Sequence, residues 1–314
     1  MADAVAVGSR VTMRYRLPPG HSHPMTDVIG SLIDYDDSVV AVKASDGRVV
    51  RISRDRVVAL KALGPRPIRT SEIRSLERAA ADGWPGVEQE WIGGWLMRAG
   101  HGFTGRANSA APLEPQATVA DLDAIAEWFS SRGLPTVLLL PDRLGSVPAG
   151  WSTRDETLVM AADISRLELP QETVSVIVEA PDDDWLGLYR YRGRPLPTDA
   201  VEVISAVHDG VTGFARIGSA ALGVLAIGRA AVTSGPDGRR WVGLTAVEVA
   251  EAHRRNGLGT RMCGELVAWG RIQGATHAYL QVAAANAGAV AMYRELGFVE
   301  HHRYRYAAPP QWRD

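Results

Sequence analysis

A glycine-punctuated turn at residues 254–259 (Arg-Arg-Asn-Gly-Leu-Gly) constrains this chain more than any other feature. It follows an apolar run at residues 242–250, typical of a strand, and precedes residues 260–271, typical of a helix. The first backbone N–H groups of a helix lack intrahelical partners, and the helix dipole adds positive potential there. Because Gly257 and Gly259 permit a close approach, this turn is suited to binding a pyrophosphate.

The sequence excludes two better-known phosphate motifs. No Gly-Lys-Ser/Thr follows the turn, as a P-loop requires, and the spacing differs from the dinucleotide-binding fingerprint. A tight turn that only starts a helix, with no ligand, would use the same residues. The segments that follow decide between these two interpretations.

Residues 278–298 supply the second part of the pattern. Residues 278–282 (Ala-Tyr-Leu-Gln-Val) predict a short strand, and residues 286–298 predict a helix that Asn286 caps and Gly297 ends. Together with the turn, they closely resemble the GNAT acetyltransferase superfamily, over about the last third of the chain. In that family Arg/Gln-x-x-Gly-x-Gly/Ala binds the pyrophosphate of acetyl-CoA, and Asn-x-x-Ala-x-x-Leu-Tyr-x-x-x-Gly-Phe flanks the pantetheine. Met292 replaces the leucine here, at similar volume.

The resemblance implies a role for each matching residue. Two splayed strands, residues 243–250 and 278–282, would hold the pantetheine, and the Val249 backbone would bond its amide or the thioester oxygen. Tyr293 would be the general acid that protonates the departing thiolate. Structural alternatives are a buried strand valine and a core tyrosine. The residues expected to bind acetyl-CoA are Val247, Val249, Arg254, Arg255, Asn256, Gly257, Leu258, Gly259, Thr260, Asn286 and Tyr293.

The residue that accepts the proton of the attacking amine is harder to assign. Glu248 is the leading candidate for the catalytic base, although strand alternation points it away from the face of Val247 and Val249. Glu251, His253 and a chain of waters are the alternatives. A turn histidine can also be merely solvated. Arg255 is expected at the periphery, near the 3′-phosphate, and Asn286 can serve as a plain helix cap.

Composition bounds the class of protein. The chain has 314 residues and 46% hydrophobic residues, enough for two or three packed domains, and its net charge of −2 does not favour a nucleic-acid partner. Its one cysteine, Cys263, permits no internal disulfide, and no signal peptide or membrane span is visible. We therefore expect a cytoplasmic protein without membrane or metal. The pairs His21/His23 and His301/His302 lack zinc-ligand spacing and are expected at the surface.

Three regions are expected along the chain, giving an α+β protein overall. Residues 1–63 predict a small all-β barrel, similar in strand rhythm to Tudor-like barrels, with a hairpin at Asp46-Gly47. Residues 64–170 predict a mixed α/β, degenerate GNAT-like region without a phosphate turn. Residues 171–314 predict a complete GNAT fold, a mixed and mostly antiparallel sheet flanked by helices. Its last strand is expected at residues 301–306.

Shorter elements are expected within these regions. In the barrel, strands are predicted at residues 11–16, 27–35, 38–43, 49–53 and 57–62. In the middle region, helices are predicted at 70–82 and 118–132 and strands at 91–99, 136–140 and 157–161. In the last region, helices are predicted at 185–191 and 198–208 and strands at 174–179, 211–217, 221–227 and 241–250.

The function implied by the resemblance is acetyl-CoA-dependent N-acetylation by direct attack of an amine on the thioester. The amine is a small molecule, a protein lysine or an N-terminus, and a homodimer is possible in this family. Two alternatives stay open. One is a non-catalytic sensor or interaction protein that binds acyl-CoA, and the other is a tandem acetyltransferase similar to mycothiol synthase.

Overall fold

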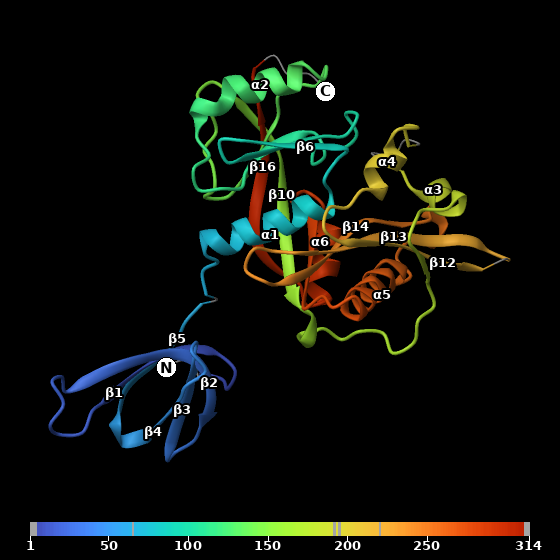
Figure 1. Ribbon diagram of the computed structural model, residues 1–314. Helices are drawn as coiled ribbons and strands as arrows, with labels where there is room; N and C mark the ends of the chain where they lie inside the picture. The colour runs from blue at the N-terminus through green and yellow to red at the C-terminus, as the bar shows by residue number, and fades with distance from the viewer. Residues whose placement is uncertain (1–4, 65, 191–192, 194–195, 220, 311–314) are drawn as a thin grey trace. The chain divides into compact units, whose positions relative to one another are not determined.

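The chain folds into two compact units, Met1–Pro67 and Ile68–Asp314 (Figure 1). The computed structural model describes residues 5–64, 66–190, 193, 196–219 and 221–310. Within these residues, no helix is both long and apolar enough to span a bilayer.

The first unit is a curled antiparallel sheet (Figure 1). Its strands are β1 (Arg10–Arg16), β2 (Met25–Tyr35), β3 (Val39–Ala44), β4 (Val49–Ser53) and β5 (Val57–Ala62). They pair in the order β4-β3-β2-β1-β5 around one core that includes Val11, Met13 and Leu32. The hairpin at Asp46-Gly47 joins β3 to β4, and Gly47 has the positive φ (+85°) that such a turn needs. The expected five-stranded unit is confirmed.

The second unit is built on one sheet of eleven strands, in the order β11-β12-β13-β14-β15-β10-β16-β9-β8-β7-β6. Among the described strands, only the pairs β14–β15 and β8–β9 are parallel, so the expected mixed and mostly antiparallel sheet is confirmed. The strands are β6 (Glu88–Ile92), β7 (Trp95–Ala99), β8 (Ser109–Pro112), β9 (Leu138–Pro141), β10 (Ser152–Asp163), β11 (Val176–Val178), β12 (Val211–Ser219), β13 (Gly223–Ser234), β14 (Arg240–Val249), β15 (His277–Ala283) and β16 (Val299–Ala308). The helices are α1 (Thr70–Gly83), α2 (Leu122–Ser130), α3 (Asp183–Leu188), α4 (Ala200–Ser205), α5 (Leu258–Ile272) and α6 (Ala287–Glu295).

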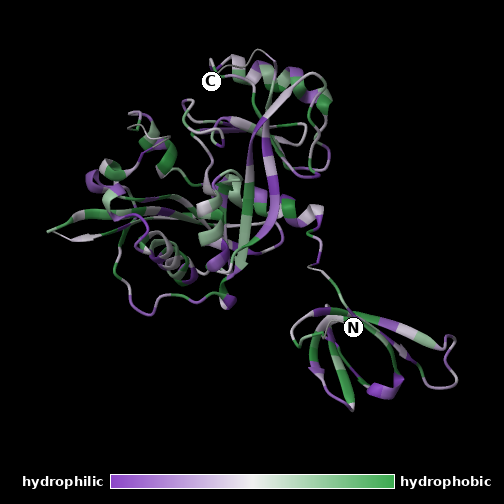
Figure 2. Ribbon diagram, turned by 180° about the vertical axis from the view of Figure 1, so that it is seen from behind, coloured by the Kyte–Doolittle hydropathy of each residue, from purple (hydrophilic) through white to green (hydrophobic). Residues whose placement is uncertain are grey.

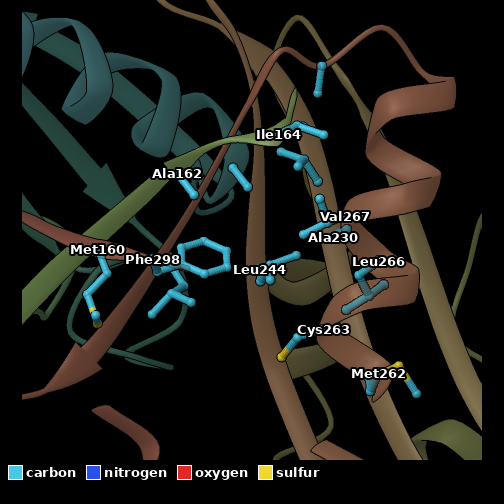
Figure 3. Close-up of a cluster of buried hydrophobic side chains, with 14 of the residues drawn as sticks. Met160, Ala162, Ile164, Ala230, Leu244, Met262, Cys263, Leu266, Val267 and Phe298 are labelled. Carbon is cyan, nitrogen blue, oxygen red and sulfur yellow. The ribbon is translucent and has the colours of Figure 1, made fainter. Parts of the chain in front are cut away.

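Helices cover both faces of this sheet. Alternate residues of a strand point to opposite faces. Ala230 and Leu244 pack against Met262, Cys263 and Leu266 of α5 (Figure 3). We call this side the α5 face, and Val290 and Phe298 show that α6 packs there too. The intervening strand residues pack against α1, α3 and α4 on the other side, which we call the α1 face.

The middle of the sheet interleaves strands from two segments of the chain. Strand β10 ends the middle segment, yet it pairs with β15 and β16, both of which come much later in sequence. Strand β16 in turn lies between β10 and β9. The last strand was expected to complete the C-terminal fold alone, and it instead joins the two segments. The division at residue 170 stays a prediction, while the sheet runs through both segments.

Strand β16 also corrects an expectation about its histidines. It is largely hydrophilic in composition and is the purple strand beside the paler β10 in Figure 2. Despite this, His302 is only 4% exposed, and its Nε2 lies 2.7 Å from Oε1 of the buried Glu77 on α1. The expected surface position is therefore wrong for His302. His21 and His23 are exposed, as expected.

Three further differences concern element boundaries. The single strand expected at residues 91–99 is a hairpin, β6 and β7, because Gly93 and Gly94 both take positive φ and reverse the chain. Strand β8 was not expected at all. Helices α3 and α4 are shorter than expected, and Tyr191, the expected end of α3, lies outside the described residues.

Candidate active site

The two strands expected to splay do so. Strands β14 and β15 pair in parallel from Trp241 with His277 to Leu244 with Leu280, and their described residues beyond that point form no ladder with each other. A bulge in β14 marks the opening: the register with β13 shifts between Thr245 and Glu248, and Ala246 has φ +51°. The opening therefore exposes strand backbone groups to a ligand.

The phosphate turn lies at the start of α5. Gly257 is the N-cap of this helix, with φ +76° and no side-chain cap bond, and the first turn contains no acidic residue. Its first N–H groups are thus free of a side-chain acceptor, and no carboxylate opposes an anion. Asn256, Gly257 and Thr260 are exposed, and Leu258 packs against the core. These features fit the pyrophosphate of coenzyme A.

The turn, β14 and α6 meet around Gly259. A Cβ at Gly259 would lie 3.4 Å from Sδ of Met292 and 3.8 Å from Cγ2 of Val249. Val247 and Val249 face the same apolar cluster on the α5 face. The structure therefore brings β14, α5 and α6 together, and among the residues expected to bind the cofactor Val247, Val249, Leu258 and Tyr293 pack against one cluster.

Helix α6 supplies Asn286 and Tyr293. Asn286 is exposed and accepts a hydrogen bond from Ala289 N (3.2 Å), which confirms its role as a helix cap. The Tyr293 ring packs against the cluster and edge-on to Phe298, with centroids 6.3 Å apart. Burial raises the pKa of Tyr293 above its ordinary value, so the phenol stays protonated near neutral pH.

Glu248 lies on the α1 face, as strand alternation predicted. It is half-buried, and burial raises its pKa, which a backbone hydrogen bond from Arg190 and the charge of Arg254 partly offset. Nη2 of Arg254 is 3.6 Å from Glu248 Oε1, and its Nε donates to Val249 O at 3.2 Å. Arg254 thus lies along the end of β14 instead of extending from the turn.

The remaining candidates lie outside this group. Glu251 and Arg255 are exposed, and His253 is part of the short 3₁₀ turn after β14. Arg255 has φ +62°, so it shapes the turn through its backbone. Among the described residues, no set of three or more His, Cys, Asp or Glu side chains is arranged to hold a metal.

Sequence reasoning missed the residues behind the opening. Gln281 is on β15 just beyond its ladder with β14, on the α1 face, and its Oε1 accepts a hydrogen bond from Nη1 of Arg106. Arg106 is in the segment between β7 and β8, 175 residues earlier. No local pattern could have indicated this contact, because it depends on how the two segments share one sheet.

The splayed strands, the uncapped turn and the flanking helices define an acetyltransferase of the GNAT class. Residues 70–307 match the family model described as "Probable histone acetyltransferase Rv0428c C-terminal", and residues 5–61 match "Rv0428c N-terminal Sm-like domain". The chain belongs to this family of acetyltransferases. Its first unit is accordingly Sm-like, a small barrel as expected.

Individual proteins agree with this assignment. The chain is 42% identical to the "Probable histone acetyltransferase Rv0428c" of Mycobacterium tuberculosis, over 98% of this chain and 96% of the relative. It is 31% identical to the "Uncharacterized N-acetyltransferase YobR" of Bacillus subtilis, over 74% of this chain and 98% of the relative. A GCN5-related N-acetyltransferase from Kribbella flavida has a similar fold, with a TM-score of 0.55, 18% identity, and coverage of 78% of this chain and 98% of that one.

Proposed function

We propose that this acetyltransferase transfers the acetyl group of acetyl-CoA to an amine by direct attack on the thioester. The observation that supports this most is the arrangement at the β14–β15 opening. A pyrophosphate-suited helix start and Tyr293 lie on the α5 face, and Glu248 lies on the α1 face. Donor and acceptor would reach the opening from opposite sides of the sheet.

Each residue would then have one task. N–H groups at the start of α5 would bind the pyrophosphate, with Arg254 beside it. The Val249 backbone, where β14 no longer pairs with β15, would hold the pantetheine amide or the thioester oxygen. Asn286, besides capping α6, would bond coenzyme A.

Proton transfers would run through two side chains. Glu248 would accept a proton from the amine, directly or through water, so that the neutral nitrogen attacks the carbonyl carbon. As the carbon–sulfur bond breaks, Tyr293 would protonate the thiolate of coenzyme A. An acyl-enzyme on Cys263 is disfavoured, because this thiol is buried in the core and burial raises its pKa to about 12.

Calorimetry with acetyl-CoA, followed by assays of thiol release with amines, tests this proposal. We expect binding, and turnover with at least one amine. Tyr293→Phe should lower kcat about 10- to 100-fold while the Kd for acetyl-CoA changes little. Equal losses in kcat and affinity would mean that Tyr293 only packs.

Two outcomes would favour the other functions. Binding of acetyl-CoA without turnover on any amine would favour an acyl-CoA sensor. Two molecules of acetyl-CoA per chain would favour a tandem enzyme, although the middle segment has no phosphate turn.

Failure to bind acetyl-CoA would overturn the proposal. Because one relative is named a probable histone acetyltransferase, peptides containing lysine belong in the amine panel.

A further inference from the structure

Three arginines with little access to water meet on the α1 face, behind the opening. Arg98 and Arg229 are 3% and 0% exposed, and Arg106 is partly exposed. The guanidinium carbons of Arg106 and Arg229 lie 5.0 and 4.8 Å from the ring centre of Trp84. Nη1 of Arg98 donates to the backbone oxygen of Trp84 at 3.3 Å. We call these three residues the arginine cluster.

The cluster lacks counter-charges. No carboxylate in the described part of the chain forms an ion pair with any of its three members. The buried carboxylate nearby, Glu77, is engaged by His302 at 2.7 Å. Arg229 donates hydrogen bonds to the carbonyl oxygens of Ile204 and Ala206, and these bonds hold its guanidinium in the core. Burial lowers the pKa values of Arg98 and Arg229, because a buried guanidinium without a counter-ion is unfavourable, so an anion that arrives beside them is favoured.

The donors of Arg98 and Arg106 are only partly used. Nε of Arg98 is buried without a partner in the structure. Arg106 forms one side-chain hydrogen bond, to Gln281, although a guanidinium carries five N–H donors. Since Arg98 and Arg229 are closed off from solvent, Arg106 is the member of the cluster that a ligand can touch.

Arg106 also has a defined position relative to the chemistry. Its partner Gln281 is on β15 just beyond the β14–β15 ladder, and Glu248 is on β14 beyond the same ladder. Both side chains alternate with residues of the α5-face core, so both lie on the α1 face. On the α1 face, the opening thus has the carboxylate of Glu248 on β14 and the guanidinium of Arg106 bound to β15 through Gln281.

We infer that the acceptor is a small amine that also carries a carboxylate, and that Arg106 binds this carboxylate. The inference rests on the proposed function. One accessible guanidinium matches a singly charged, planar carboxylate in two parallel hydrogen bonds. A phosphate would call for more than one accessible cation. The amine end of such a zwitterion would meet Glu248.

The buried members of the cluster would assist in a second way. Their positive potential disfavours a protonated amine at the opening, which lowers the pKa of the acceptor and favours the neutral nucleophile. A lysine side chain within a peptide would meet the same potential without offering a carboxylate. The cluster therefore selects against it.

Matched acceptors test this inference on the full chain, with acetyl-CoA and thiol release as the readout. The pairs are L-lysine with cadaverine, L-histidine with histamine and L-phenylalanine with phenethylamine, together with a lysine peptide blocked at both ends. We expect kcat/KM to be roughly 10- to 100-fold higher for the carboxylate-bearing member of at least one pair, mainly through KM.

Variants assign the preference to Arg106. Arg106→Gln should reduce the ratio within the pair towards one, and Arg106→Lys, which keeps the charge but not the fork, should leave part of it. Arg132→Gln is the matched control, because Arg132 also stacks on a tryptophan, Trp128 at 3.9 Å, in another core cluster. Arg132→Gln should keep the full ratio of kcat/KM between the two members of a pair.

Several outcomes would overturn the inference. They are equal kcat/KM within every pair, a preference for the blocked peptide, or an equal loss of kcat for all acceptors in Arg106→Gln. If acetyl-CoA binds but no amine of either kind is acetylated, the inference fails as well. Absence of acetyl-CoA binding would instead overturn the proposed function, so the two failures are distinguishable.

Discussion

At the scale of single residues, Gly257 combines a conformational and an electrostatic requirement. Its φ is +76°, and a Cβ there would have no protein atom within 4 Å. Gly257→Asp would meet no neighbouring atom, would carry the strain of a side chain at positive φ, and would oppose the pyrophosphate by its charge. We expect the Kd for acetyl-CoA, measured by calorimetry, to rise at least about tenfold.

Gly257→Asn is the control for this variant. Asparagine has nearly the same shape as aspartate and tolerates positive φ, but it carries no charge. Its Kd should stay within a few-fold of the unmodified protein. An equal loss in the two variants would show that the turn contributes conformation and no anion site.

The pH dependence of turnover should report on Glu248. Burial raises its pKa, and a base works only when deprotonated, so kcat/KM should rise with pH through a range above that of an exposed carboxyl. Arg254→Gln removes a nearby positive charge, which raises that pKa further. The acid limb of the profile should then move to higher pH. A limb that stays in place would exclude Glu248 as the base.

For single residues, the sequence indicated the proposed coenzyme A side of the site well and the proposed acceptor side poorly. The residues proposed to meet coenzyme A belong to two short motifs and the strand before them, so local spacing was sufficient to single out Gly257, Val249 and Tyr293. Arg106 and Gln281 are 175 residues apart in the chain. Their contact follows from strand order, which no local pattern contains.

At the scale of elements, α5 packs unusually close to the sheet. A Cβ added at Gly270 would lie 2.5 Å from the Cβ of Val242 on β14. Gly270→Ala should thus force the helix outward and lower the free energy of unfolding by about 1–3 kcal/mol. Chemical denaturation of the full chain measures this change.

Gly288 in α6 provides the comparison. Nothing lies within 4 Å of a Cβ at this position, and alanine favours a helix over glycine by up to about 1 kcal/mol. Gly288→Ala should therefore be neutral or stabilising. If Gly270→Ala behaves in the same way, the close approach of α5 does not constrain the fold.

Most elements were predictable because their signals are local. The five strands of the Sm-like unit and helices α1, α2, α5 and α6 follow from apolar periodicity, caps and turn residues. The β6–β7 hairpin was missed because residues 91–99 were interpreted as one strand, although Gly93-Gly94 is a two-residue hairpin signal. His302 was misplaced because its burial depends on Glu77, which α1 supplies from 225 residues away.

At the scale of the whole molecule, the interleaved strands make Ile68–Asp314 one folding unit. A fragment of residues 171–314 lacks β10, which pairs with both β15 and β16. Unpaired edges of this length favour aggregation. We expect the fragment to be insoluble or unfolded alone and to be restored when residues 64–170 are co-expressed. Circular dichroism and solubility measure both outcomes; a folded fragment would contradict the prediction.

The position of β16 has a consequence for how this protein is made. A ribosome adds its residues 299–308 well after those of β9 and β10, yet they fill the place between these two strands near the middle of the sheet. During synthesis the edges of β9 and β10 that β16 covers therefore stay without this partner until β16 emerges. A chaperone that shields those edges, or a fast insertion of β16, would decide the yield of active enzyme in the cell.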